Sequence, residues 1–355
     1  VREQTINECE DTIRRYEGVI GDLRAALQQR EQTTADMMPA GADPGDAGGD
    51  RFLEISPKRG TPDIADRRLS PTEADRWLDA WRQVAAKYAD VVLSKGQTLI
   101  EPYLVERIIH DRIGRVIIGT VEGRNWYDNN NTIELPHLLR LGMIREGDTV
   151  FDCGANQGVN ALFYARAVGA TGRVLAFDPF ALNIDIGHFN ARLNDAGNID
   201  FIQAGLSDQA GRAVVSLAEQ STGLVNETAA DAVPINLVPL DMFAALRPSF
   251  LKIDVEGAEV NALEGARDVV AQEPAIYIEV HPHYLPRFDR SPMDIFKHIS
   301  LDRYTCYIDH PNVPLFAEYR GEFEMTEGCA LYCVPKSRPS LTRHFGSSRQ
   351  SGRQP

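Results

Sequence analysis

The sequence is poor in cysteine, and its five cysteines form neither a disulfide pattern nor a metal-binding pattern. No C-x-x-C pair occurs, and an odd number leaves no complete set of pairs. Most of them lie in apolar, strand-like sequence, where a free cysteine behaves as a small hydrophobic residue. We therefore expect free thiols at Cys9, Cys153, Cys306, Cys329 and Cys333.

Long apolar runs and an excess of positive charge are also missing. No stretch approaches the roughly 18 apolar residues of a membrane span, and the sequence does not open on a charged-then-apolar signal segment. The 37 basic residues are outnumbered by 51 acidic ones, which gives a formal net charge of −14. Such a charge argues against nucleic acid or an anionic membrane as a partner. We expect a cytoplasmic protein without a transmembrane segment.

The first 30 residues carry a heptad pattern. Spacings of three and four alternate, as in the seam of a coiled coil, through Ile6, Cys9, Ile13, Tyr16, Ile20, Leu23 and Leu27. The pattern predicts a coiled-coil helix over residues 1–30 and self-association through it. The alternative is an amphipathic helix that packs on the protein's own body.

Two segments have the composition of chain without a packed core. Residues 31–69 are rich in Gly, Asp, Ala and Pro, which predicts a flexible linker. Residues 336–355 hold five basic residues and no acidic one, which predicts a disordered basic tail. Binding of this tail to an anionic partner is the alternative.

The remaining sequence predicts one α/β domain over residues 98–335, preceded by a helix. Ser70 and Glu73 form a capping box around a proline, so a helix over residues 70–97 is expected to pack on the domain. The predicted strands are 116–121, 148–152, 173–177, 199–203, 250–254, 275–280, 304–308 and 329–334. Alternation of strands with helices predicts a doubly wound, mostly parallel sheet. No long helix separates the last two strands, which favours an antiparallel edge.

The sharpest functional signal is VFDCGANQG at residues 150–158, where an apolar strand ends in an acid and a glycine turn leads into a helix. Glycine is needed where a ligand approaches the backbone closely, and a helix N-terminus attracts an anionic group. Asn156 replaces the middle glycine of the dinucleotide pattern G-x-G-x-x-G, and no P-loop G-K-[ST] follows. An ordinary strand-to-helix turn is the alternative. The residues expected to bind a cofactor here are Asp152, Gly154, Ala155, Asn156 and Gly158.

The next two strand ends supply further candidates for the cofactor site. VLAFDP ends in Asp178, 20 residues beyond the glycine turn, where a carboxylate can accept both hydroxyls of a ribose. Pro179, the next residue, is a further candidate contact of the cofactor. The alternative role of Asp178 is to cap the helix that follows Pro179. The loop after the third strand lies where the base of a nucleoside would rest, and Leu206 and Ser207 are its candidate contacts.

Charged residues also follow the fourth and fifth strands. FLKIDVEGAE at residues 250–259 places Lys252 and Asp254 on one side of a strand, where charges are costly to bury unless paired or functional. Glu279 and His281 share a face of the next strand, and either can accept a hydroxyl proton. The catalytic candidates are therefore His281, Glu279, Lys252 and Asp254.

Two alternatives stay open for this group. Lys252 can form an ion pair with Asp254 or Glu279 that only supports the fold. Asp254, Glu279 and His281, with His283, can instead ligate a divalent metal, although the commoner case is a solvated histidine without one.

Together these motifs resemble the FkbM-type methyltransferases. The matching segments are residues 150–158, 174–179, 206–208, 250–259, 263–266 and 276–282, with the pair Asn190 and Asn194. The resemblance implies a class I methyltransferase (Rossmann-like) fold and S-adenosylmethionine as cofactor. It also implies O-methylation of a sugar, glycan or secondary-metabolite hydroxyl. By position it makes Gly154–Gly158 and Asp178 cofactor residues and Lys252–Glu259 active-site residues. Cys153 departs from the family, which usually has an aliphatic residue there.

Two other functions remain as alternatives. One is a dinucleotide-dependent oxidoreductase, against which Asn156 argues. The other is a scaffold in which the coiled coil matters and the α/β domain is inactive, against which the acids at two strand ends argue. For the methyltransferase, the predicted chemistry is an in-line attack by an acceptor oxygen on the sulfonium methyl group.

Overall fold

The computed structural model describes residues 69–91, 93, 97–109, 112–128, 138–139, 141–216, 232–310, 317–321 and 324–338, with residues 14, 18 and 21. The predicted coiled coil over residues 1–30, the predicted linker and the basic tail fall outside these ranges, apart from residues 14, 18, 21, 69 and 336–338. Self-association through the coiled coil therefore stays a prediction. Within the described ranges, each helix is too short or too polar to span a bilayer.

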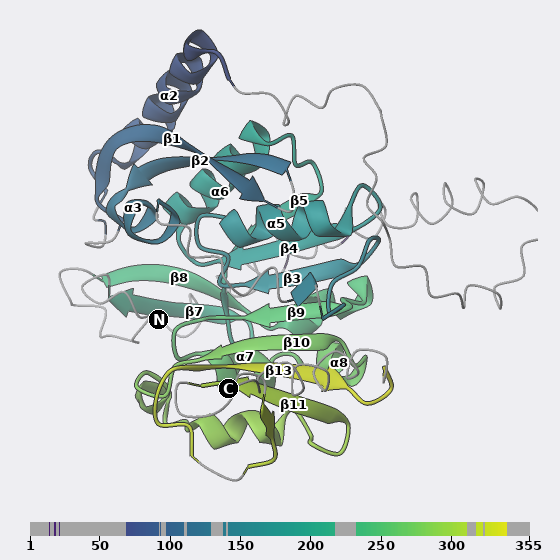
Figure 1. The fold of residues 1–355 in the computed structure, drawn as a ribbon. Helices are drawn as coiled ribbons and strands as arrows, with labels where there is room; N and C mark the ends of the chain where they lie inside the picture. Colours follow the sequence, from purple (N-terminus) through teal and green to yellow (C-terminus); the bar gives the residue numbers. More distant parts are fainter. Residues whose placement is uncertain are drawn as a thin grey trace, which may run out of the picture.

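An eight-stranded sheet forms the centre of the molecule (Figure 1). Its strand order is β12-β11-β13-β10-β9-β3-β4-β5. The strands are β3 (Thr149–Cys153), β4 (Arg173–Asp178), β5 (Ile199–Gln203), β9 (Phe250–Ile253), β10 (Ala275–Val280), β11 (Tyr304–Asp309), β12 (Ala317–Tyr319) and β13 (Cys329–Pro335). The five strands β10, β9, β3, β4 and β5 pair with their neighbours in parallel. β13 pairs antiparallel with β10 and with β11, and β12 pairs antiparallel with β11. The predicted doubly wound sheet with an antiparallel edge is confirmed, and β12 extends that edge.

Helices cover both faces of this sheet because successive strand residues point to opposite sides. Val150 belongs to an apolar cluster with α5 (Val159–Val168). Phe151, the next residue, belongs to the opposite cluster. That cluster also receives apolar residues from α7 (Glu259–Glu264), α8 (Arg267–Ala271), and the 3-10 helices η3 (Leu240–Leu246), η4 (Leu285–Phe288) and η5 (Pro292–Lys297).

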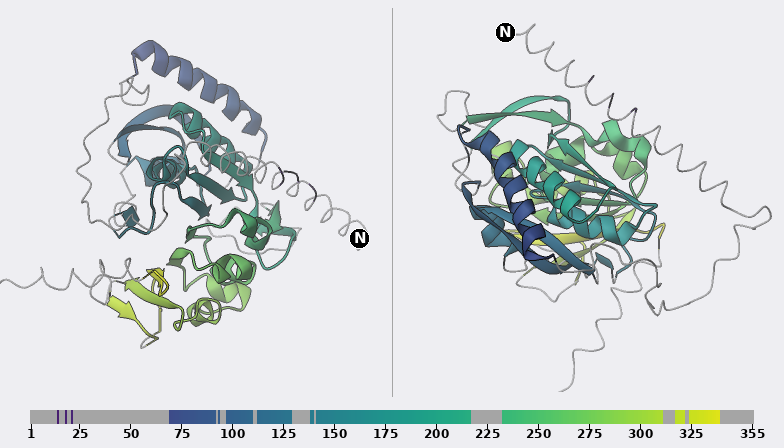
Figure 2. Two further views of the ribbon diagram at one scale, coloured as in Figure 1. Left: turned by 90° about the vertical axis from the view of Figure 1, so that its right-hand side faces the viewer. Right: turned by 90° about the horizontal axis from the view of Figure 1, so that it is seen from above.

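The segment before the sheet forms a cover over α6 (Ala181–Leu193). It consists of α2 (Pro71–Ala85), η2 (Ala86–Tyr88), the hairpin of β1 (Leu99–Ile109) and β2 (Arg112–Thr120), and α3 (Val121–Tyr127). The capping box is confirmed, since the Ser70 hydroxyl accepts from the Glu73 amide at 3.3 Å. Trp81 of α2 is buried edge-on against Phe189 of α6, with ring centroids 5.4 Å apart. Figure 2 shows α2 lying along α6 and the hairpin.

Asn190 of α6 and Asn194, which follows the helix directly, connect α6 with the β1–β2 hairpin. The Asn190 carboxamide accepts from the Ile117 amide at 2.9 Å and donates to the Gln157 carbonyl at 2.9 Å. Asn194 accepts from the Arg115 amide and donates to its carbonyl, at 2.8 and 2.6 Å. Because Gln157 lies in the glycine turn, Asn190 connects that turn with the hairpin.

A three-stranded sheet stands beside the ends of the parallel strands. It comprises β6 (Gly205–Leu206), β8 (Ala232–Val238) and β7 (Gly211–Ser216), and it was not expected from the sequence. In Figure 1 the β7–β8 hairpin projects from the side of the central sheet. β3 has β4 on one side and β9 on the other, so the loops after these strands meet where the direction of winding reverses. In open α/β sheets ligands bind at this point.

Replacing Asn190 by alanine leaves one buried amide and one buried carbonyl without a partner. Each loss costs about 1–3 kcal/mol, so we expect Asn190→Ala to lower the free energy of unfolding by about 2–6 kcal/mol in urea denaturation. Arg192→Ala, at an exposed position of the same helix, is the control and should cost no more than about 1 kcal/mol. Equal stability of the two variants would contradict the bridging role of Asn190.

Candidate active site

One cavity opens at the carboxyl ends of β3, β4 and β9, under the small sheet. Six of the nine predicted cofactor residues line it: Gly154, Asn156, Asp178, Pro179, Leu206 and Ser207. Of the predicted catalytic residues, Asp254 lines it, while Lys252, Glu279 and His281 stand behind or beside it. Side chains from four separate loops therefore surround one space.

The glycine turn is shaped by left-handed backbone at three positions. Gly154, Asn156 and Gly158 have φ of 80°, 47° and 74°. A Cβ at Gly154 would overlap the backbone carbonyl oxygen of Asp254, so only glycine lets the loops after β3 and β9 touch. Asparagine tolerates the left-handed region better than most residues, which explains its place in the middle of the turn.

Asp178 receives three hydrogen bonds at the end of β4. Its carboxylate accepts from the Asn156 amide at 3.1 Å, the Phe180 amide at 2.9 Å and the Asn183 carboxamide at 3.2 Å. Burial raises the pKa of Asp178 to about 7, although these hydrogen bonds lower it. The bond to Phe180 fits the capping alternative, and the position in the cavity wall fits the cofactor alternative. Both roles are compatible, because a carboxylate has about four acceptor sites.

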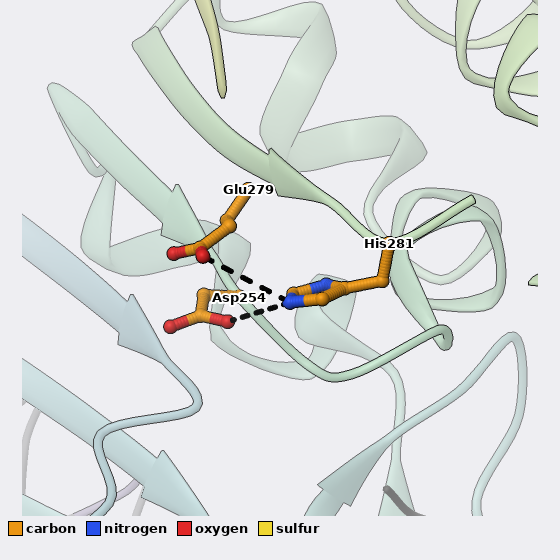
Figure 3. A group of neighbouring side chains, drawn as sticks. All are labelled: Asp254, Glu279 and His281. Carbon is orange, nitrogen blue, oxygen red and sulfur yellow. Dashed lines mark ion pairs between the residues drawn. The ribbon is translucent and has the colours of Figure 1, made fainter. Parts of the chain in front are cut away.

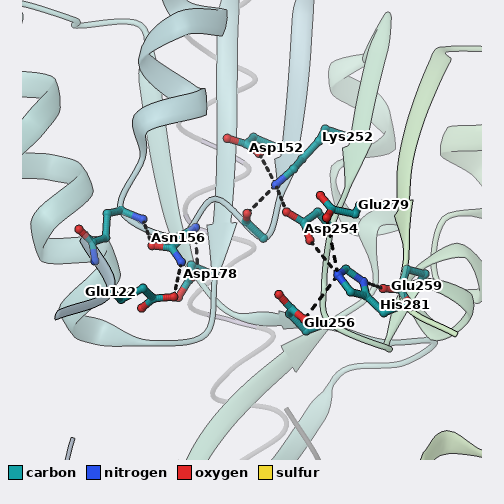
Figure 4. A network of polar contacts seen from close by, with 12 residues as sticks. Glu122, Asp152, Asn156, Asp178, Lys252, Asp254, Glu256, Glu259, Glu279 and His281 are labelled. Atoms are coloured by element: carbon teal, nitrogen blue, oxygen red, sulfur yellow. Dashed lines mark hydrogen bonds and ion pairs between the residues drawn. The ribbon is translucent and has the colours of Figure 1, made fainter. Parts of the chain in front are cut away.

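Asp152 is placed differently from what the sequence suggested. It is fully buried and does not line the cavity; its carboxylate lies 3.4 Å from Lys252 Nζ (Figure 4). The reason is register: Asp152 pairs with Ala176, two residues before Asp178 on β4, and faces the neighbouring strand. Asp152, which the sequence placed among the cofactor-binding residues, therefore does not face the cavity that Asp178 lines. Burial raises the pKa of Asp152 to about 6, against the opposing effect of Lys252.

Lys252 links the two central loops. Its ammonium donates to the Gly154 carbonyl at 2.7 Å and lies 3.1 Å from Asp254 Oδ2. Burial lowers the pKa of Lys252, but the carboxylates of Asp254 and Asp152 outweigh it and hold this pKa well above its usual value. The ion-pair alternative thus describes Lys252, which is a positioning residue for the glycine turn.

Four carboxylates surround His281 at the ends of β9 and β10. His281 Nδ1 lies 2.7 Å from Glu259 Oε1, and Nε2 lies 3.5 Å from Glu256, 3.9 Å from Asp254 and 3.9 Å from Glu279 (Figure 4). Burial lowers the pKa of His281, but the Glu259 hydrogen bond and the nearby carboxylates raise it to about 9. His283, the fourth candidate metal ligand, is exposed and belongs to no such group.

Two of these carboxylates, Glu256 and Glu259, lie in the range that the resemblance assigned to the active site, but neither was named as a catalytic candidate. Glu259 is completely buried and also accepts from the Gly257 amide at 2.9 Å. Glu256, held at φ 53°, lines the cavity, and burial raises its pKa to about 7. The motif DVEGAE was the available signal, but its spacing alone does not show which acid faces the ligand.

Glu122 is a further cavity residue that sequence reasoning missed. It stands in the first turn of α3, and its Oε1 accepts from the Asn156 carboxamide at 2.9 Å. Burial raises the pKa of Glu122, although the bond from Asn156 lowers it. No motif surrounds it, so only the tertiary structure reveals that the hairpin and α3 bring an acid to the glycine turn.

The chain was also compared with known proteins. Residues 152–318 match the methyltransferase FkbM domain family, whereas none of the curated proteins matches the chain. Similar solved structures include methyltransferase FkbM from Methylobacillus flagellatus KT, at 18% identity and TM-score 0.36 over 60% of this chain and 54% of that one. A SAM-dependent O-methyltransferase from Thermotoga maritima has 11% identity and TM-score 0.35, over 64% and 76%. A SAM-dependent methyltransferase from Aquifex aeolicus has 13% identity and TM-score 0.34, over 59% and 95%.

Residues 152–318 are therefore an FkbM methyltransferase domain, and S-adenosylmethionine is its methyl donor. Its central sheet has the class I methyltransferase order that the resemblance implied. The family match decides against the dinucleotide-dependent oxidoreductase. The contacts of individual residues with the cofactor stay predictions, and Asp178 offers the sharpest test.

If the Asp178 carboxylate binds the ribose hydroxyls, it must be ionised in the complex. Its pKa of about 7 means that binding below neutrality releases a proton, so affinity should rise as the pH rises from 6 to 8. We expect the affinity for S-adenosylhomocysteine, measured by titration calorimetry, to increase up to about tenfold over this range. In Asp178→Asn it should be at least about tenfold weaker at pH 8 and nearly independent of pH.

The matched control is Asp195→Asn. Asp195 is an exposed acid just after α6, the helix that Asp178 precedes. It should bind S-adenosylhomocysteine like the wild type at each pH. Wild-type affinity in Asp178→Asn at pH 8 would show that the ribose assignment is wrong.

Proposed function

We propose that this methyltransferase transfers the methyl group of S-adenosylmethionine to a hydroxyl oxygen of a sugar, a glycan or a secondary metabolite. The supporting observation is the division of the cavity: the glycine turn and Asp178 form one part of its wall, and Asp254 and Glu256 form another. The first part suits the donor. The second suits an acceptor that gives up a proton.

The reaction itself needs little covalent chemistry from the protein. An oxygen lone pair attacks the methyl carbon, the carbon–sulfur bond breaks, and S-adenosylhomocysteine leaves. The acceptor's O–H bond must also break, and its proton needs a base within hydrogen-bond reach. Holding oxygen, carbon and sulfur in line contributes the larger part of the acceleration.

The acidic wall also indicates the kind of acceptor. Carboxylates can accept hydrogen bonds from neighbouring hydroxyls, so they suit a neutral, hydroxyl-rich molecule. They repel an acceptor whose reactive end carries a carboxylate or phosphate. An uncharged sugar ring or polyol meets both conditions.

We assign proton acceptance to Glu256. Among the described residues of the His281 group, Glu256 and Asp254 line the cavity, and Asp254 is already paired with Lys252. Glu256 Oε2 lies 3.5 Å from His281 Nε2, at the side of the cavity where the acceptor is proposed to bind. The bases predicted from the sequence, His281 and Glu279, remain the alternative, and substitution separates the two hypotheses.

The nature of the acceptor atom can be tested with donor labelled by ¹³C in its methyl group. The enzyme is incubated with this donor and small-molecule extracts or panels of glycosides and polyols. The chemical shift of the labelled methyl carbon then distinguishes ethers from N-methyl, S-methyl and C-methyl products. We expect methyl ethers. Transfer only to nitrogen, sulfur or carbon would refute the proposal.

Replacing Glu256 by glutamine removes the proposed base and keeps the side-chain shape. General-base catalysis contributes about 10²–10⁴-fold, so we expect kcat of Glu256→Gln to fall by at least about 100-fold. Affinity for S-adenosylhomocysteine should change less than about threefold, since the ribose and carboxylate contacts stay. A smaller loss of kcat than in His281→Gln would transfer the role of base to His281.

A further inference from the structure

We propose that Asp254, Glu279 and His281 bind one divalent cation at the edge of the methyl-transfer cavity. The three residues come from the ends of adjacent parallel strands. Asp254 follows β9, while Glu279 is in β10 and His281 follows that strand directly. Figure 3 shows their side chains turned toward one another.

The distances suit ligands of a single ion. One ligand atom from each residue lies within 4.8 Å of the other two. His281 Nε2 is 3.9 Å from Asp254 Oδ1 and 3.9 Å from Glu279 Oε1. Two ligands that each lie about 2.1 Å from one ion are roughly 3–4 Å apart, so small side-chain rotations complete the site.

A second, independent observation is the carboxylate behind the histidine. Glu259, completely buried, lies 2.7 Å from His281 Nδ1 and is itself held by the Gly257 amide. A carboxylate only accepts, so Nδ1 carries a hydrogen. Nε2 faces Asp254 and Glu279, and it gives up its own hydrogen when an ion binds. Metal-binding histidines characteristically have this arrangement, in which the outer carboxylate fixes the ring and its tautomer.

The negative charge around His281 also favours a bound cation. Asp254, Glu256, Glu259 and Glu279 all lie within 4 Å of the His281 ring nitrogens. Lys252 pairs with Asp254 through Oδ2 and is shared with Asp152, which leaves Oδ1 of Asp254 directed at the imidazole. Negative charge collected in a partly buried space is stabilised by a cation.

The three ligands favour a divalent ion that accepts both carboxylate oxygen and imidazole nitrogen. Two carboxylates suit Mg²⁺ and Mn²⁺, and an imidazole suits Mn²⁺ better than Mg²⁺, so we take Mn²⁺ as the probe. The role of the ion rests on the proposed function: beside the cavity it lowers the pKa of a coordinated acceptor hydroxyl, and Glu256 takes the proton. Binding of the ion itself does not depend on that role.

The test uses the full chain after treatment with a chelator, without donor or acceptor. Free Mn²⁺ is measured by electron paramagnetic resonance during titration. We expect one saturable site per chain. Glu279→Gln, half exposed in the wild type, should weaken binding at least tenfold, and His281→Gln should do the same.

Glu327→Gln is the matched control. It is an exposed acid two residues before Cys329, the partner of Val280, and so lies near the same strand end. It should bind Mn²⁺ like the wild type. Unchanged affinity for S-adenosylhomocysteine and an unchanged melting temperature show that each variant is folded.

The outcomes separate this proposal from the proposed function. Absence of a saturable Mn²⁺ site, or equal binding by Glu279→Gln and Glu327→Gln, overturns the cation site. If the chelated enzyme still forms methyl ethers at the full rate, the ion has no role in transfer although O-methylation stands. If Mn²⁺ binds as expected and no hydroxyl is methylated, the site stands and the proposed function fails.

Discussion

The site depends on the contacts that the buried ammonium group of Lys252 makes with two loops. This group joins the Gly154 carbonyl of one loop to Asp254 of the next, with Asp152 beneath them. A buried ion pair adds little stability relative to apolar packing, but loss of one partner leaves an uncompensated charge. Its contribution here is geometric. The loop that is proposed to hold the methyl donor and the loop that is proposed to hold the acceptor are fixed to each other through one side chain.

The parts of this arrangement that follow from local physics could be predicted from the sequence. The periodicity of apolar residues predicted which segments form the strands of the central sheet and which form the helices between them, because each period reflects which side chains face a core. The glycine turn was recognisable because the left-handed backbone at Gly154 and Gly158 restricts the residue type. Asp178 was recognisable because a strand end has a fixed position relative to that turn. The capping box at Ser70 is equally local.

The parts that depend on contacts between distant segments could not be predicted. Glu122 reaches the glycine turn only because the β1–β2 hairpin folds over α6, and no motif marks it. Asp152 faces Lys252 through the register of β3 with β9, which alternation alone does not fix. The small sheet beside the cavity pairs β6 with a strand far along the chain. Glu256 and Glu259 share one motif, yet one faces the cavity and the other is buried behind His281.

Glu256 and Glu259 are only three positions apart in the sequence, yet their side chains lie in different surroundings. Gly257, at φ 102°, packs directly against Tyr284, so the chain reverses between the two acids. Glu256 precedes this turn and lines the cavity, whereas Glu259 follows it, begins α7 and lies behind the His281 ring. An acid in contact with solvent can exchange protons with an acceptor, whereas a fully buried acid held by an amide and a histidine is suited to fix an orientation. The same stretch of backbone thus carries the proposed base and the carboxylate that holds the His281 ring. A side chain at residue 257 would disturb both, because it would separate the loop from Tyr284.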